Sequence, residues 1–192
     1  YYFERAKIGA GAFRHEVGNL IQFVTGTCST ADAAALGVAP IACASPSNVG
    51  NSRSQGFELE AGAKPLDWLY METGYMYLDS RDLDTGSFLF NRSPHAWKSR
   101  IRVEYDGWDL TTRLRYFSSF GFSDLNRNNR VDSNEKAPSN FQIDMRLSKT
   151  FKNGIEIYGG VENLTESRIS VRSGSVPLEG PRLWFVGMRM TL

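Results

Sequence analysis

The sequence predicts an all-β fold: a transmembrane antiparallel up-and-down β-barrel, to which these 192 residues supply about eight strands. Three observations predict it. Apolar and polar side chains alternate with a period of two, over segments close to the roughly 9–11 residues that a tilted strand needs to cross a bilayer. Short and long connections alternate along the chain. The four tryptophans (Trp68, Trp97, Trp108 and Trp184) lie near the ends of these segments, where an interfacial aromatic girdle would place them.

Residues 5–23 form the first and least regular predicted strand. Ala6, Ile8 and Ala10 share one face, as alternation requires. The pattern breaks near His15, where we expect a β-bulge.

The other seven strands follow the alternation more closely. We place them at residues 57–65, 69–77, 97–105, 110–120, 141–151, 155–161 and 183–192. The clearest is the one that starts at Phe141, where Phe141, Ile143 and Met145 share a face and Gln142 and Asp144 lie on the other. An apolar period of two excludes an amphipathic helix, whose period is 3.6.

The connections indicate the topology. The short ones are residues 64–67, 106–107 and 153–154, and the long ones are 25–52, 80–93, 121–139 and 166–180. Asp-Gly and Asn-Gly pairs suit type I′ hairpin turns, which need positive φ at both positions. Strict alternation places all tight turns at one end and all long loops at the other, as in outer-membrane barrels with their short periplasmic turns.

Charge and hydropathy limit the classes of function. The net charge of +1 gives no electrostatic reason to expect a nucleic-acid partner. Mean hydropathy is −0.35, and no run approaches the roughly 18 apolar residues of a transmembrane helix. A soluble meander or sandwich with one wet face is the alternative, but it has no reason to alternate its loop lengths.

Many charged residues fall on the polar faces of the predicted strands. They are Lys7, Glu58, Glu60, Lys64, Glu72, Lys98, Arg100, Arg102, Glu104, Arg113, Arg115, Asp144, Arg146, Glu156, Glu162 and Arg189. A closed eight-stranded barrel has an interior just wide enough for side chains, and burying this many charges there is costly. The charges therefore favour an arc of a wider barrel.

Three segments carry a family resemblance. They are Gly56-Phe57-Glu58-Leu59-Glu60, Val161-Glu162-Asn163-Leu164-Thr165 and Gly180-Pro181-Arg182. In this order, with the last opening the final strand, they resemble the C-terminal part of TonB-dependent outer-membrane receptors. The chain ends at Leu192 where that family usually has Phe. The resemblance implies a barrel of about 22 strands with a plugged lumen, of which residues 1–192 supply the last eight.

The same resemblance implies a function. It predicts a Gram-negative outer-membrane protein that takes up a metal chelate, first a ferric siderophore and then cobalamin or another chelate. Energy would come from TonB through a plug that this sequence does not contain. The partners would be the chelate, TonB and outer-membrane lipid, with no nucleic acid. A stand-alone eight-stranded anchor or adhesin, and a fragment of a passive porin, are the alternatives.

The loop from Asp124 to Glu135 matches a twelve-residue calcium loop. Its ligands would be Asp124, Asn126, Asn128, the backbone carbonyl of Arg130, Asp132 and Glu135. Asn129 takes the place of the usual Gly at the sharp turn. A polar, Asn-rich surface loop that matches by chance is the alternative.

Other loop residues suggest weaker hypotheses. Cys28 and Cys43 share the first long loop and predict a disulfide, worth about 3 kcal/mol for a loop of roughly 15 residues; thiol catalysis or metal binding is the alternative. The stretch 31–36 between them suits a short helix.

Arg53, Arg92 and residues 88–90 could contact a ligand or a neighbouring molecule, although ordinary loop packing explains them as well. His15 and His95 are isolated, and nothing marks a nucleophile. We therefore expect no enzyme.

Overall fold

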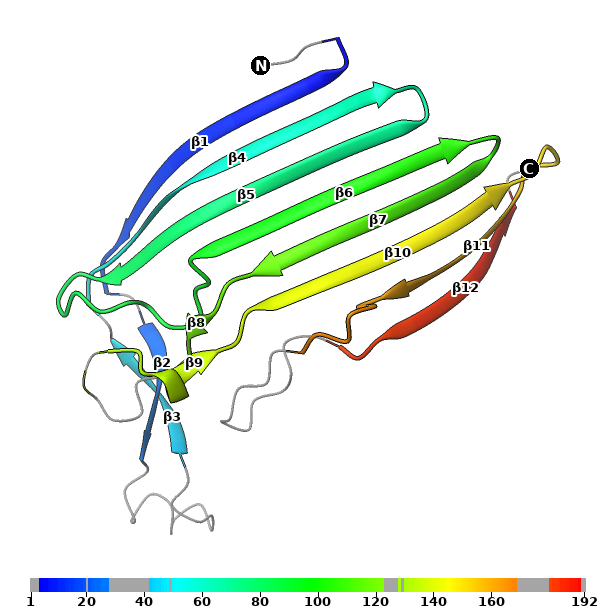
Figure 1. Cartoon of the computed structure of the whole chain (residues 1–192). Helices are drawn as coiled ribbons and strands as arrows, with labels where there is room; N and C mark the ends of the chain where they lie inside the picture. Colours follow the sequence, from blue (N-terminus) through cyan, green and yellow to red (C-terminus); the bar gives the residue numbers. More distant parts are fainter. Residues whose placement is uncertain are drawn as a thin grey trace.

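The computed structural model describes residues 4–19, 21–27, 42–48, 50–122, 128, 130–168 and 180–190, and only the backbone of 22–27 and 42–48. These residues form one large antiparallel sheet, two small two-stranded sheets and a single 3-10 turn (Figure 1). No helix in these ranges is both long and apolar enough to span a membrane.

Eight strands make the large sheet, and each pairs antiparallel with the next. In spatial order they are β1 (Ala6–Val17), β4 (Ser52–Leu66), β5 (Leu69–Asp82), β6 (His95–Tyr105), β7 (Trp108–Phe117), β10 (Asn140–Thr150), β11 (Ile155–Glu162) and β12 (Leu183–Met190). This order confirms the predicted up-and-down meander with alternating short and long connections.

The small sheets belong to the long connections. In the first, β2 (Ile21–Thr27) pairs with β3 (Ala42–Asn48); in the second, β8 (Phe120–Gly121) pairs with β9 (Lys136–Ala137). The 3-10 turn η1 (Ser133–Glu135) comes directly before β9. All of them lie at the end of the sheet away from the tight turns (Figure 1).

The large sheet is curved and open. Its edges are β1 and β12, which lie at opposite ends of the strand order (Figure 1). In hydrocarbon every backbone N–H and C=O needs a partner, so a spanning sheet with two free edges has to continue on both sides. The prediction of an arc from a wider wall is confirmed, and the stand-alone eight-stranded barrel is not what this chain forms.

The first predicted strand is wrong in its extent. β1 pairs with β4 without a register shift from Ala6 to Val17, so there is no bulge at His15. The chain instead leaves the wall at Gly18 and Asn19, and Asn19 has a positive φ of 56°. Glycine and asparagine tolerate this conformation, which turns the chain into β2.

The long loops are also shorter than the sequence predicts. β4 starts at Ser52 rather than near residue 57, and β5 continues to Asp82 rather than ending near residue 77. Apart from Leu78, these ends carry no large apolar side chain on either face, so hydrophobic alternation does not reveal them. Arg53, predicted to lie in a loop, therefore lies in a strand.

Two of the three tight turns fall where they were predicted, but not all have the predicted type. The first lies at residues 67–68 rather than 64–67, because β4 continues to Leu66 through a register shift after Ala63. Asp106 and Gly107 both have positive φ, 47° and 74°, as a type I′ turn requires. At the second hairpin only Gly154 has positive φ, at 80°, and its N–H donates to the carbonyl of Phe151 at 3.1 Å. The Asn-Gly pair therefore marks the turn correctly but makes a longer one.

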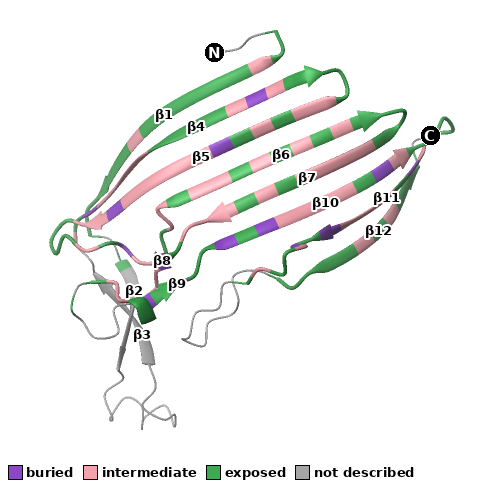
Figure 2. Ribbon diagram, in the orientation of Figure 1, coloured by how far each residue is buried: buried purple, intermediate pink, exposed green. Residues whose placement is uncertain are grey.

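The sheet has no dry core on either face. Among the described residues, the only buried hydrophobic ones are Leu89, Phe120, Ala137 and Val161. By contrast Val186 in β12 is 83% exposed, and exposed and intermediate residues dominate every strand of the large sheet (Figure 2). A soluble sandwich would bury this face against a second layer, and the described residues form no such layer.

The apolar face carries two levels of aromatic residues. The strand registers place Phe57, Tyr75, Tyr77, Trp97 and Tyr116 on this face near the long loops. Trp68, Tyr105, Trp108 and Phe151 lie at the tight-turn end. Amphipathic rings favour both boundaries of a hydrocarbon layer, and these two levels mark them. We call this face outward and the opposite face inward.

Candidate functional site

The inward face carries the charged residues that the sequence places on the polar faces of the strands. Strand registers align them in rows across the sheet. One row runs Lys7, Gly62, Glu72, Arg100 and Arg113, and the next runs Gly9, Glu60, Gly74, Lys98 and Arg115. The wall therefore presents both signs of charge side by side.

Ion pairs connect neighbouring strands along these rows. They are Arg100–Glu72 at 3.1 Å, Arg102–Asp109 at 2.6 Å, Arg115–Asp144 at 3.0 Å, Arg146–Glu156 at 2.6 Å and Arg189–Glu156 at 2.7 Å. Apart from the two pairs of the largely buried Glu156, these pairs are partly exposed and contribute only about 0–1 kcal/mol each. Their main effect is to hold long side chains against the wall.

Two glycines let lysines reach carboxylates two strands away. Lys98 of β6 lies over Gly74 of β5, with its Cε 2.9 Å from where a Cβ would be, and its Nζ is 3.5 Å from Glu60 of β4. Lys7 of β1 crosses Gly62 of β4 in the same way, and its Nζ is 4.0 Å from Glu72 of β5. A Cβ at either glycine would force the crossing lysine side chain to shift.

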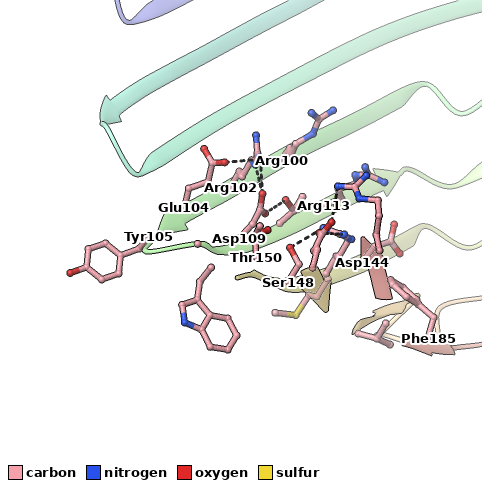
Figure 3. Close-up of a pocket in the computed structure, with 18 of the residues that line it drawn as sticks. Arg100, Arg102, Glu104, Tyr105, Asp109, Arg113, Asp144, Ser148, Thr150 and Phe185 are labelled. Carbon is pink, nitrogen blue, oxygen red and sulfur yellow. Dashed lines mark hydrogen bonds and ion pairs between the residues drawn. The ribbon is translucent and has the colours of Figure 1, made fainter. Parts of the chain in front are cut away.

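The tightest part of the inward face lies over β10 to β12. Glu156 accepts a hydrogen bond from Arg146 and forms an ion pair with Arg189, and its side chain is only 9% exposed. The guanidinium of Arg146 also lies 4.7 Å from the ring centre of Tyr158. Beside this cluster is a hollow of about 850 Å³, lined by polar residues from β6, β7, β10, β11 and β12 (Figure 3).

One cation on this face has no anionic partner. Arg113 is exposed and has no ion pair or hydrogen bond with any described residue. Its register neighbour in β6 is Arg100, and its neighbour in β10, Asp144, is already bonded to Arg115 and to the backbone N–H of Asn163. The wall therefore offers an uncompensated positive charge to whatever occupies its concave side.

Asn163 closes the long-loop end of β11. It has a positive φ of 52° and is 4% exposed. Its amide nitrogen donates to the carbonyls of Ser167 at 3.0 Å and Gly180 at 2.9 Å, and its side-chain oxygen accepts from the N–H of Ser167 at 3.0 Å. This one side chain joins both ends of the last long connection.

The neighbours of Asn163 extend this clamp. Thr165 Oγ1 donates to the carbonyl of Phe141 at 2.8 Å, and Arg182 Nε donates to the carbonyl of Leu164 at 3.1 Å. Two of the three segments that carry the family resemblance, residues 161–165 and 180–182, thus meet in space, whereas residues 56–60 lie in β4. We use the term Asn163 clamp for Asn163, Leu164, Thr165 and Arg182.

The chain can now be compared with known proteins. It has a charged concave wall, an apolar convex face, two free edges and the Asn163 clamp. Residues 1–164 match the family described as "TonB dependent receptor-like, beta-barrel". The chain belongs to this TonB-dependent receptor family. Members of the family are transporters of the Gram-negative outer membrane and not enzymes, as the sequence predicts.

Solved structures of receptors share the fold of this chain. "Copper transporter OprC" aligns with a TM-score of 0.71 at 14% identity, over 98% of this chain and 29% of that one. A variant of the ferric enterobactin receptor of Pseudomonas aeruginosa gives 0.70 at 15%, over 98% and 29%. The siderophore receptor PiuA of Acinetobacter baumannii gives 0.67 at 16%, over 98% and 26%. No curated protein sequence matches the chain.

This receptor chain spans less than a third of the length of those structures. Its eight strands correspond to part of a barrel wall.

The calcium hypothesis stays a prediction. Asp124 and Asn126 lie outside the described residues. Of the other predicted ligands, Asn128 donates to Asp132 at 3.0 Å, and buried Glu135 accepts the backbone N–H of Asp132 at 2.9 Å. Within the described part of the chain, no group of three His, Cys, Asp or Glu is placed to hold a metal.

Some of the remaining predicted sites lie outside the described residues and others lie within them. Cys28 and the side chain of Cys43 lie outside the described residues, as does the helix expected at 31–36, so the disulfide is untested. His95 lies on the outward face, where its Nδ1 is 2.7 Å from the hydroxyl of Tyr75. The sequence analysis did not predict the two glycine crossings. A glycine on the polar face of a strand is a signal that could have indicated them.

Proposed function

We propose that the intact receptor takes up a metal chelate across the outer membrane, with energy delivered through TonB, and that this chain supplies part of its wall and external loops. One observation carries the proposal: a concave face of paired charges on a sheet whose convex face is apolar and exposed. Such a sheet separates lipid from a wide polar interior, which a transport path requires.

A plug would occupy the concave side. The unpartnered Arg113 and the polar hollow beside Glu156 offer charge and hydrogen bonds to a polar domain packed against the wall. A charged wall of this kind suits a passive porin as well as a receptor. The match to the receptor family is what favours the receptor.

The cargo is the finer part of the proposal. We favour a ferric siderophore, with cobalamin or another chelate next. Two relatives in the structural comparison are named as siderophore or enterobactin receptors and one as a copper transporter. Contacts with the cargo would come from loops and plug, and this chain supplies only some of the loops.

Uptake by living cells tests the proposal. A strain that lacks the intact receptor should lose accumulation of radioactive iron from one ferric siderophore, and plasmid-borne receptor should restore it. A protonophore or loss of TonB should abolish the restored uptake. Normal accumulation of every siderophore, cobalamin and copper chelate tested in the deletion strain would contradict active uptake; uptake that persists without TonB would indicate a passive channel.

A further inference from the structure

Charged residues extend the outward face beyond its upper aromatic level at one flank of the sheet. They are Arg14 and Glu16 of β1, Arg53 of β4, and Asp79 and Arg81 of β5, which we call the outward arginine patch. The register pairs Glu16 with Arg53 and Arg53 with Arg81, in the same outward parity as Phe57 and Tyr77.

The height of the patch follows from strand geometry. Arg53 precedes Phe57 by four residues, which is about 13 Å along a strand and about 10 Å along the membrane normal at the usual tilt. The patch therefore lies above the upper aromatic level, among head groups of the outer leaflet, and faces the lipid side of the wall rather than the lumen.

Both carboxylates of the patch are already engaged. Glu16 pairs with Arg14, whose Nε donates to Glu16 Oε1 at 3.0 Å. Asp79 accepts from Arg81 Nε at 2.8 Å and from Gln55 at 3.5 Å. Arg53 has no ion pair or hydrogen bond with a described residue, and its Nε is covered by protein without a partner. Its register neighbour Glu16 attracts it electrostatically but is hydrogen-bonded to Arg14, so the terminal nitrogens of Arg53 can take a further anion.

Arg53 lies directly opposite Arg81 on one side and Glu16 on the other, and Glu16, which is shared with Arg14, offsets the repulsion between Arg53 and Arg81 only in part. Like charges at opposed positions of an antiparallel pair destabilise a sheet. Arg81 is fixed in place, because its guanidinium carbon lies 3.7 Å from the ring centre of Phe88 and its Nη1 donates to the carbonyl of Gly86 at 3.3 Å. It therefore cannot turn away from Arg53 without losing these contacts.

Phe88 adds an apolar surface beside the two arginines. Its ring is 49% exposed although it covers Arg81. A soluble anion gains nothing from an exposed ring, whereas an amphipathic molecule anchored in the membrane can contact both the ring and the charges. We propose that the outward arginine patch binds a phosphate of an outer-leaflet glycolipid, with Arg53 as the principal contact.

Lipid retention by the intact receptor tests this site. Purified receptor in detergent would be incubated with phosphorylated lipid A or with its dephosphorylated form, and bound lipid counted by native mass spectrometry. We expect phosphorylated lipid to be retained at least tenfold better. Arg53→Gln should remove this preference and Arg53→Glu should abolish retention, while Lys149→Ala, an outward cation at the tight-turn end, should change neither.

Several outcomes would overturn the proposal. Equal retention of the two lipids would show that the phosphate is not recognised, and full retention by folded Arg53→Gln would show that Arg53 is not the contact. Displacement of the lipid by millimolar inorganic phosphate would indicate a site for soluble anions instead. The heat-induced shift in gel mobility reports folding of each variant, and Arg53→Gln keeps the test usable if Arg53→Glu does not fold.

Discussion

The two flanks of the sheet end differently at the side of the long loops. β4 and β5 are 15 and 14 residues long and continue past the aromatic level, whereas β11 and β12 have only 8 residues each. The short flank ends in the Asn163 clamp, which binds both ends of its loop. The described residues of the long flank include no such clamp, and its strands are extended by backbone pairing together with cross-strand hydrogen bonds between side chains, such as Ser54–Ser80 at 2.8 Å. The same wall thus supports its loops either by one side chain that joins both ends of a loop or by longer paired strands.

The largest effect should come from removing the clamp. Asn163→Ala leaves the carbonyls of Ser167 and Gly180 without their donor and keeps an unfavourable positive φ. We expect unfolding of the intact receptor to become easier by about 3 kcal/mol, since several buried hydrogen bonds are lost together. Urea unfolding followed by tryptophan fluorescence would measure it.

Two controls separate the contributions at Asn163. Asn163→Gly removes the side chain but relieves the strain, so it should recover part of the loss. Asn19→Ala, at the long flank, alters a residue with a similar φ of 56° and no side-chain clamp. If Asn19→Ala destabilises the receptor as much as Asn163→Ala, backbone strain rather than the clamp explains the effect.

A smaller effect should follow from adding one methyl group to inward glycines. A Cβ at Gly187 in β12 would collide with the ring of Tyr158, whereas a Cβ at Gly11 in β1 would meet nothing within 4 Å. Gly187→Ala should destabilise the receptor by about 2 kcal/mol, as overpacking does, and Gly11→Ala should be nearly neutral. Equal effects in urea unfolding would mean that the two flanks are packed alike.

Neutralising one cation of an ion pair should change the free energy of unfolding less, and by an amount that depends on how far the pair is buried. Arg146→Gln takes one of two cations from a carboxylate that is only 9% exposed, and should cost about 1.5 kcal/mol. Lys98→Gln breaks a pair whose side chains are 75% and 56% exposed, and should cost at most about 0.5 kcal/mol. A salt titration of the stability should weaken the Lys98 effect first. The reverse order of costs would contradict this account of burial.

The smallest expected effect concerns the predicted calcium loop. If Asp124 to Glu135 binds calcium with millimolar affinity, a chelator should speed proteolysis within this loop severalfold and leave global unfolding unchanged. Glu135→Gln should remove the calcium effect, with Glu104→Gln as the control on the wall. Identical cleavage rates with and without chelator would remove the calcium hypothesis.

Hydrophobic alternation predicted the wall because it is the requirement for separating lipid from a polar interior. It failed where that requirement ends. Residues 42–48, with Pro46 and two serines, resemble a loop, yet they form β3, whose partner is another loop segment. The ends of β4 and β5 were missed for the same reason, since a strand above the membrane has no apolar face to reveal it.

The site was predicted as a set of residues but not as an arrangement. Which charge faces which depends on register, and register is not readable from one strand alone. Lys98 and Glu60 are not on adjacent strands, and only the structure shows that Gly74 lies between them. Asn163 was recognised through its motif, whereas its bonds to residues on both sides of a long connection required the fold.

Gly62 and Gly74 also affect how far the charged side chains project from the concave surface. An extended lysine side chain would project into the barrel interior. Over a glycine the side chain lies flat and keeps its ammonium group close to the wall. The interior can therefore be densely charged and still smooth. A polar domain packed against such a lining would meet few upright side chains where Lys7 and Lys98 cross the two glycines, and both of these cations are already paired with carboxylates.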